Sequence, residues 1–450
     1  MAPSSAPNQA SAGHLLELIR SGRATNRGEL QRATGLSRST VGHRLEQLFG
    51  AGWVREGTAG PSPGGGPGGR PAARLEFDPT HAVVLAADLE TRHARAAVLD
   101  LDGRLLAEHS GPLLVDDGPE AVLDGLAAWF AALLDSAGEP GLPVCGVGLS
   151  IPGPVEFGSG TVVQPPMMPG WDGFPIPDGM RRALAARIPD DRCPRGAFGG
   201  HSGGAPLPVL VDNDANLIAY AEQRAGHPDC TAFLLVKAST GIGAGMVVNG
   251  GIYRGIDGGA GDIGHVRLDD RPDALCRCGS YGCLAAVASG WALAAELTAA
   301  GVPAASGSDV HRLLAAGHPA AVRAAQQAGR RMGEVLGTAV TLLNPGVLMF
   351  AGDLAGPAFL AGVREELYQR AMPRTTAHLQ VVTAEPGDTA GLAGAAALVV
   401  EELYAPHRAD ARLAEAGAPP GRPAAGRPAA LRAKSAGLPA VGAGRRPDGG

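Results

Sequence analysis

Three cysteines and one histidine stand close together between residues 260 and 289. Cys276 and Cys278 are separated by one residue, Cys283 follows shortly after, and His265 lies just upstream. Three thiolates and one imidazole form a closed tetrahedral set for zinc, with no position left for a catalytic water. Buried free cysteines are the alternative, but thiols seldom cluster so densely in a reduced chain. The spacing therefore predicts a structural zinc site at His265, Cys276, Cys278 and Cys283.

The motifs around these residues resemble those of a known family. The segment AGDIGH, which ends at His265, and the following CRCGSYGC resemble the ROK family of sugar kinases and sugar-responsive repressors. The likeness extends upstream through GVGLSIPGPVEF, VLVDNDAN and TGIGAG, and downstream through LNPGVLMFAGDL and DTAGLAGAA. The resemblance implies an α/β fold with two lobes, the actin-like (ribonuclease H-like) fold of sugar kinases, and a ligand cleft between the lobes.

The resemblance also assigns the residues of a sugar site. Asp214 matches the family's catalytic aspartate, which takes a proton from a sugar hydroxyl during phosphoryl transfer. The same carboxylate can bind a sugar without any chemistry. Asn213 matches a neighbouring sugar ligand, and Asp262 stands where the kinases usually have glutamate. His265 is expected to bind zinc through one ring nitrogen and the sugar through the other.

Two departures from the kinase pattern argue against the use of ATP. Family kinases have DxGGTK at the end of the first strand, where this chain has Asp88 followed by LETRH, and Glu90 adds a negative charge near the expected phosphates. Ala285 replaces a sugar-binding carboxylate in GCLA. The turn TGIGAG resembles the second phosphate loop, although a purely structural turn explains it equally well. Its candidate nucleotide ligands are Thr240, Gly241, Gly243 and Gly245. ATP and Mg²⁺ are expected only if the protein is a kinase.

The N-terminal region carries positive charge on an acidic protein. The whole chain has a formal net charge of -6, whereas residues 14–74 hold nine arginines and four glutamates. Within this region Asn26 and Ser37 are suited to cap helices, and Gly35 is suited to end one. Two short strands joined by a loop rich in glycine and proline follow the third helix. This order predicts a winged helix-turn-helix at residues 12–77 that binds DNA.

The third helix, residues 38–49, has an apolar stripe at Val41, Leu45 and Leu48 that should face the core. The candidate DNA contacts lie on its other faces and in the wing: Arg38, Ser39, Thr40, His43, Arg44 and Arg70. His43 taken alone fits a polar surface residue better than a residue that reads a base. A helical interaction module with an incidental excess of arginine is the alternative for the whole region.

The rest of the chain gives domain boundaries. We expect one lobe at residues 82–208 plus 388–404 and a second lobe with the zinc site at 209–387. Residues 1–11 and 405–450 are expected to be disordered, and 190–206 to form a surface insertion. The sequence contains neither a signal peptide nor an apolar run of membrane-spanning length, which predicts a cytoplasmic protein without membrane contact.

These patterns favour a transcriptional regulator, expected to be a repressor of carbohydrate-utilisation genes, that binds operator DNA and senses a sugar or sugar derivative. Relatives in the family usually form dimers or tetramers, which suits paired half-sites. An active ATP-dependent sugar kinase carrying a DNA-binding domain is the main alternative. A sugar-binding scaffold without operator recognition is the third.

Overall fold

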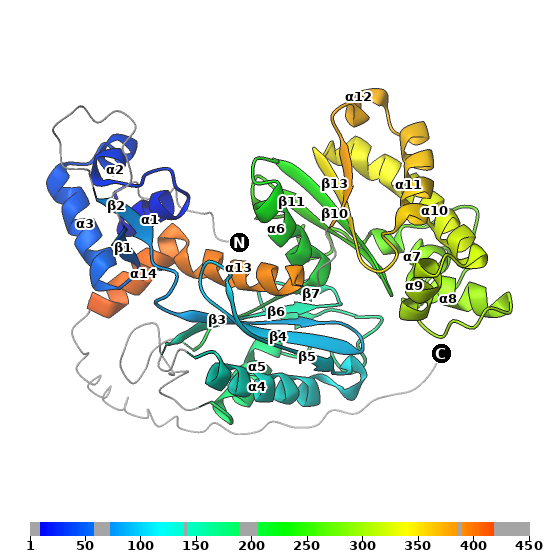
Figure 1. Cartoon of the computed structure of the whole chain (residues 1–450), viewed down its shortest axis with the longest axis horizontal. Helices are drawn as coiled ribbons and strands as arrows, with labels where there is room; N and C mark the ends of the chain where they lie inside the picture. Colours follow the sequence, from blue (N-terminus) through cyan, green and yellow to red (C-terminus); the bar gives the residue numbers. More distant parts are fainter. Residues whose placement is uncertain (1–9, 58–72, 139–141, 189–205, 385–388, 418–450) are drawn as a thin grey trace, which may run out of the picture. The chain divides into compact units, whose positions relative to one another are not determined.

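The N-terminal region folds into three short helices followed by a two-stranded antiparallel sheet (Figure 1). The computed structural model describes residues 10–57, 73–138, 142–188, 206–384 and 389–417. Ser11, Asn26 and Ser37 cap the three helices, and each side chain accepts a hydrogen bond from a backbone N–H of its own first turn. The elements are α1 (Ala12–Arg20), α2 (Arg27–Thr34), α3 (Arg38–Gly50), β1 (Val54–Gly57) and β2 (Arg74–Phe77). The three helices and two strands thus follow one another in the order predicted for a winged helix-turn-helix, while Arg70 lies outside the described residues.

A five-stranded mixed sheet forms the first lobe, with the order β5-β4-β3-β6-β9. Strands β3 and β6 are buried along their whole length, which explains their almost continuous apolar sequences. Helices α4 and α5 cover one face of this sheet, and α13 covers the other (Figure 1). The elements are β3 (Val83–Leu89), β4 (His93–Leu99), β5 (Leu105–Pro112), η1 (Val115–Asp117), α4 (Pro119–Ser136), β6 (Val144–Ile151), β7 (Val155–Glu156), β8 (Thr161–Val162), α5 (Ile176–Ala185), β9 (Val209–Asn213) and α13 (Ala390–Tyr404).

A second five-stranded sheet, with the order β12-β11-β10-β13-β14, forms the other lobe. Its strands alternate between two cores: Leu234 and Val236 pack toward α10, while Phe233 and Leu235 pack toward α6. The elements are α6 (Asp214–Gly226), β10 (Ala232–Ala238), β11 (Ile242–Val248), β12 (Gly251–Ile252), η2 (Ile263–His265), α7 (Ala285–Ala288), α8 (Gly290–Ala299), α9 (Gly307–Ala315), α10 (Pro319–Leu343), β13 (Val347–Ala351), α11 (Pro357–Arg370), α12 (Pro373–Thr376) and β14 (Gln380–Thr383).

Helix α13 packs against both lobes. It contacts β3 and β6 of the first sheet and α6 of the second lobe. Two glycines permit this close approach, because a Cβ on Gly148 would overlap the carbonyl of Ala395 and one on Gly394 would overlap the carbonyl of Leu217. The two-lobed α/β architecture that we predicted is thus confirmed, with α13 as a shared element between the lobes.

Three predicted boundaries differ from the structure. Strand β9 pairs in parallel with β6, so the first lobe extends to Asn213 and does not end at residue 208. Residues 406–417, predicted to be disordered, form helix α14 (Pro406–Gly417), in which Ala409 is fully buried. At the other end Ser11 is buried and caps α1. Alanine and arginine are strong helix formers, and tertiary contacts decide that these flanking segments are ordered.

The remaining predictions of disorder fall on residues outside the described ranges, as does the insertion at 190–206 apart from its last residue. Among the helices that the structure describes, none combines the length and the apolar composition that a membrane crossing requires.

Candidate functional site

A cavity of about 410 Å³ lies at the ends of β3, β6 and β9 and against the turn between β10 and β11. All four predicted sugar-site residues line it: Asn213, Asp214, Asp262 and His265. Thr240, Gly241 and Gly243 line it as well. Gly245 does not, because it lies within β11 with its backbone against the carbonyl of Ala215. Three of the four candidate nucleotide ligands therefore border the cavity, and the fourth packs against α6.

Asp214 begins helix α6 at the carboxyl end of β9. The side chain of Asn213 caps this helix by accepting from the N–H of Ala215, and its amide donates to the carbonyl of Gly153 at 3.1 Å. Both residues are thereby held at the cavity wall by backbone contacts. A carboxylate and an amide fixed in this way can accept from and donate to sugar hydroxyls.

The carboxylate of Asp214 already has a partner that the sequence analysis missed. Lys237 of β10 donates from Nζ to Asp214 Oδ2 over 2.6 Å, and both side chains are largely buried. Burial alone lowers the pKa of Lys237, but the charges of Asp214 and Asp88 outweigh it, and the pKa ends above its usual range. The ammonium is therefore charged. The sequence feature that could have identified this residue is a single lysine inside the otherwise apolar strand AFLLVKA.

Asp88 forms the other carboxylate of this charged group. It ends β3, is 8% exposed, and accepts a hydrogen bond from Ser150 Oγ. Burial raises the pKa of Asp88 to about 6, while the charge of Lys237 opposes the rise. Glu90, also at the cavity, adds a third negative charge. Lys237 is thus paired with Asp214 and lies within the electrostatic influence of two further carboxylates, those of Asp88 and Glu90.

Asn216 is a further cavity residue that sequence reasoning did not select. Its Nδ2 donates to Asp212 Oδ1, so the orientation of the amide is fixed. Its Oδ1 is buried and accepts no hydrogen bond from any residue in the described ranges. A buried acceptor of this kind needs a donor, and a sugar hydroxyl can supply one.

The predicted metal ligands come together beside the cavity. One ligand atom each from His265, Cys276, Cys278 and Cys283 lies within 4.8 Å of all the others. Cys276 Sγ is 3.8 Å from His265 Nδ1, and Cys278 Sγ is 3.8 Å from Cys283 Sγ. Ligands at the corners of a tetrahedron around zinc, with bonds of about 2.3 Å, are about 3.8 Å apart. The spacing thus fits zinc, and it directs Nδ1 of His265 toward the metal position.

The proposed DNA-reading helix presents only part of its predicted face. Arg38, Ser39 and His43 of α3 are exposed and Thr40 is half-buried. Arg44 is committed elsewhere, since its Nε donates to the carbonyl of Ala10 and its Nη1 to Gln47 Oε1. This arginine braces α3 against the start of α1, which leaves Arg38 as the more available cation of the pair.

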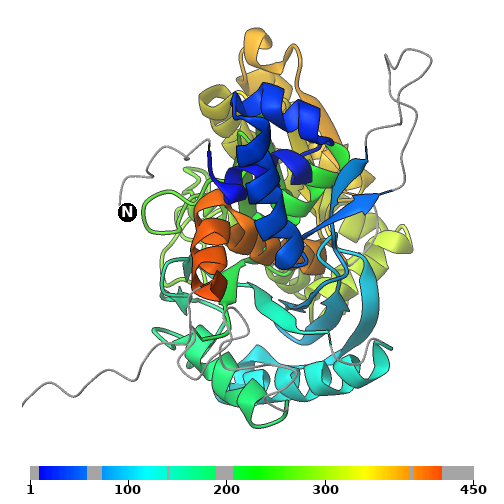
Figure 2. The same ribbon diagram turned by 90° about the vertical axis from the view of Figure 1, so that its left-hand side faces the viewer.

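The N-terminal region shares its core with α13 and α14. Arg412 of α14 lies over the rings of Trp53 and Tyr404, at 4.5 and 4.7 Å from their centroids. Trp53 and Tyr404 meet edge to face, and Asp410 accepts from the N–H of Gly13. Figures 1 and 2 both show α14 in orange-red against the blue N-terminal helices. Leu15, Leu45 and other inward residues of α1–α3 belong to the same apolar core as Val399 and Leu403 of α13.

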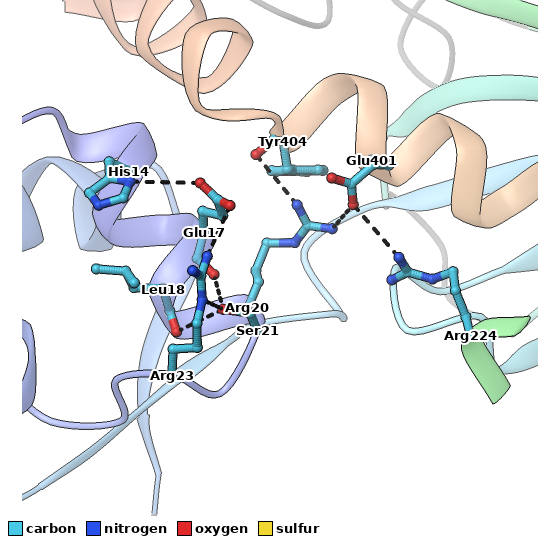
Figure 3. A network of polar contacts seen from close by, with 9 residues as sticks. All are labelled: His14, Glu17, Leu18, Arg20, Ser21, Arg23, Arg224, Glu401 and Tyr404. Atoms are coloured by element: carbon cyan, nitrogen blue, oxygen red, sulfur yellow. Dashed lines mark hydrogen bonds and ion pairs between the residues drawn. The ribbon is translucent and has the colours of Figure 1, made fainter. Parts of the chain in front are cut away.

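Polar contacts reinforce this junction (Figure 3). Arg20 of α1 donates to the carbonyl of Tyr404 and pairs with Glu401, and Glu401 also lies 4.0 Å from Arg224 of α6. The Tyr404 hydroxyl contacts His81 Nε2 over 2.6 Å. Since His81 Nδ1 must donate to the carbonyl of Asp78, Nε2 is the acceptor. At its opposite end α13 begins against Asp88, where a Cβ on Gly391 would overlap the carboxylate.

Comparison with known proteins agrees with these features. The family model described as ROK matches residues 204–402. A putative xylose repressor from Caldicellulosiruptor sp. strain Rt8B.4 is 27% identical over 407 residues, covering 87% of this chain and 95% of that protein. The crystal structure of a ROK family transcriptional regulator, a homologue of the E. coli Mlc protein, is 23% identical with a TM-score of 0.72, covers 90% of this chain and 99% of that one, and shows the same fold. The ROK hexokinase of Thermus thermophilus is 30% identical with a TM-score of 0.55, covering 71% of this chain and 99% of that structure. The protein therefore belongs to the ROK family.

Proposed function

We propose that this protein is a sugar-responsive DNA-binding transcriptional regulator, with repression of carbohydrate-utilisation genes as the expected sign. The relative named a xylose repressor matches 87% of the chain, whereas the hexokinase matches 71%. The observation that carries the proposal is the continuous core that joins the helix-turn-helix to the body containing the cavity. A location in the cytoplasm, and assembly as a dimer or tetramer on paired half-sites, follow from this role.

The sugar would bind in the cavity through Asn213, Asp214, Asp262 and His265. Asn216 Oδ1 offers an additional acceptor for a hydroxyl. Zinc bound at His265 Nδ1 would leave Nε2 for the sugar and fix the tautomer of the ring. All four positions of the metal are taken by protein ligands, so the zinc would be structural. In this account the metal loop orders one wall of the sugar site.

Operator DNA would be bound by residues 12–77. Arg38, Ser39, Thr40 and His43 are the contacts favoured on α3, and Arg70 is proposed in the wing. Arg44 is proposed to contact DNA only indirectly, by positioning α3. Phosphate contacts from arginine would make affinity depend on salt.

Helix α13 is our candidate for the coupling between cavity and DNA. Its first turn lies against Asp88, and its last turn carries Glu401 and Tyr404 at the junction with α1. A sugar that binds two arrangements of this helix unequally would change the operator affinity by the same factor. This coupling requires that α13 has two discrete arrangements and that both the sugar and the DNA favour one of them.

The proposal is tested with purified full-length protein. Duplexes selected by the protein from random-sequence DNA provide an operator probe, and a panel of pentoses, hexoses and amino sugars is then screened for a change in operator affinity. A sequence-selective footprint that one sugar shifts supports the regulator. A protein that binds sugar but selects no DNA sequence would instead be a sugar-binding scaffold.

An active sugar kinase is the second candidate, favoured by the retention of Asp214 at the cavity wall. As a base, this carboxylate would have to accept a proton from a sugar hydroxyl while it is paired with Lys237. ADP release measured with ATP, Mg²⁺ and the same sugar panel decides the question. Sugar-dependent ADP release that Asp214→Asn abolishes would establish the kinase.

A further inference from the structure

The cavity wall carries a cation of the protein itself, the ammonium of Lys237. Lys237 projects from an otherwise apolar strand, between Val236 and Ala238, which are fully buried. Its ammonium is 2.6 Å from Asp214 Oδ2 and lies within the electrostatic influence of Asp88 and Glu90. A buried ammonium in an apolar strand is costly unless carboxylates compensate it. The lysine therefore persists here because the carboxylates hold it.

The carboxylates depend equally on the lysine. Asp88 and Asp214 are both 8% exposed, and each would be an uncompensated buried charge without an ammonium nearby. They come from different elements, the end of β3 in the first lobe and the start of α6 after β9. Lys237 comes from the second lobe. The ammonium of Lys237 therefore compensates acidic groups that come from both lobes. A bound divalent cation has the same electrostatic role in metal sites of other proteins.

We propose that Lys237 is a specificity-determining residue that serves as the resident counter-cation of the cavity. Through its ion pair with Asp214 and its attraction to Asp88, it engages the carboxylates that a metal–nucleotide complex would need. The cavity accordingly accepts an uncharged polyhydroxylated ligand and rejects nucleotide with its divalent cation. This inference deepens the proposed regulator function, since it rests on the ligand being a neutral sugar and explains why the chain senses without phosphorylating.

A phosphate-binding lysine is the opposing interpretation, because lysine is common at phosphate sites. Here the ammonium is already paired, and the three carboxylates exceed it in charge by two. A phosphate group approaching Lys237 would meet Asp214 beside it and the negative charges of Asp88 and Glu90, so repulsion outweighs attraction. The two interpretations predict opposite effects of removing the lysine.

The experiment titrates Mn²⁺ into zinc-loaded full-length protein and follows the bound metal by electron paramagnetic resonance. Lys237→Met removes the ammonium and leaves Asp88 and Asp214 without their counter-cation, so the variant should bind one Mn²⁺ at least about tenfold more tightly than the native protein. Adding Asp214→Asn to Lys237→Met should abolish this binding. Lys237→Arg keeps the charge and should behave like the native protein. Circular dichroism and zinc content establish that each variant is folded.

A folded Lys237→Met variant without a new Mn²⁺ site would overturn the proposal. So would native protein that binds MgATP and loses it in Lys237→Met, because the lysine would then serve phosphate. If Lys237→Met does not fold, the native protein and Asp214→Asn still test the proposal. Mn²⁺ binding by the native protein that is lost in Asp214→Asn would contradict a resident counter-cation. The Mn²⁺ titration needs neither DNA nor sugar. A failure of operator binding would therefore reject the regulator function, while the Mn²⁺ titration would still test the role of Lys237.

Discussion

The two ends of α13 meet their surroundings through different kinds of contact. The first turn lies against Asp88, in a group of three carboxylates and one ammonium that borders the cavity. The last turn carries Tyr404, which packs against Trp53 and Arg412 in an apolar core. Electrostatic interactions are strong beside a cavity of low dielectric constant, whereas a close-packed core transmits strain as a unit.

This difference indicates that the two ends of α13 have different roles. The cavity end is suited to respond to a ligand, and the other end is suited to fix the orientation of the DNA-binding region. Because the N-terminal helices share their core with α13 and α14, the N-terminal region is not an independent module. Experiments on this protein therefore need the full chain.

The largest expected effect comes from the junction. Tyr404 is fully buried, so Tyr404→Ala removes aromatic packing against Trp53 and Arg412 and should lower the free energy of unfolding by about 3–5 kcal/mol. Operator affinity should fall as well, because the orientation of α1 and α3 is lost. Tyr368→Ala on α11 is a matched control, since its side chain is about half exposed. Urea denaturation measures the difference, and equal effects of the two substitutions would show that the junction adds no stability.

Loss of zinc should act next, at the cavity end. We expect Cys276→Ser or Cys278→Ser to lower zinc content and to weaken the effect of sugar on operator binding, because the loop that holds His265 would lose its order. Cys230→Ser is the control, since Cys230 lies outside the cluster. Metal content by mass spectrometry is read beside operator titrations. An unchanged sugar response in a zinc-free variant would show that sugar sensing does not depend on the metal.

Asp88 should make stability depend on pH. Its pKa is about 6 in the folded protein and higher than its ordinary value, so the folded state binds this proton more tightly than the unfolded chain does. The contribution to stability is fully present below about pH 4 and is lost as the pH rises through about 6. The advantage of native protein over Asp88→Asn should therefore decline by about 1–3 kcal/mol across this range. A constant difference in unfolding free energy would contradict the assignment.

The smallest effect concerns the arginines of α3. Arg38→Ala should weaken operator binding and reduce the slope of log affinity against log salt by about one. Arg44→Ala should leave that slope nearly unchanged, because its guanidinium donates to Ala10 and Gln47. Arg330→Ala on the distant α10 is the control. Equal loss of slope in both α3 variants would place Arg44 on DNA as well.

Much of this arrangement was predictable from the sequence. Capping residues and apolar periodicity located α1–α3, and the cysteine spacing located a cluster whose geometry fits zinc. Family motifs located Asn213 and Asp214 at the cavity.

Other features depend on contacts between distant segments. The pairing of β9 with β6 moved the lobe boundary, and burial of Ala409 against the N-terminal core ordered α14. The partner of Lys237, Asp214, is 23 residues away in the sequence and comes beside it only in the fold. The helical pattern around Arg44 likewise gave no sign that its guanidinium donates to the carbonyl of Ala10. Local patterns do not determine such partners.

The central claim is that a sugar in the cavity changes operator affinity. The most direct measurement is an operator titration of the full-length protein with and without the sugar identified by screening, repeated with Asp214→Asn, while the stability of the variant is followed by urea denaturation. We expect a sugar-dependent shift in the native protein that disappears in a folded Asp214→Asn variant, which still binds operator. A shift of equal size in both proteins, or no shift with any sugar that binds, would contradict it.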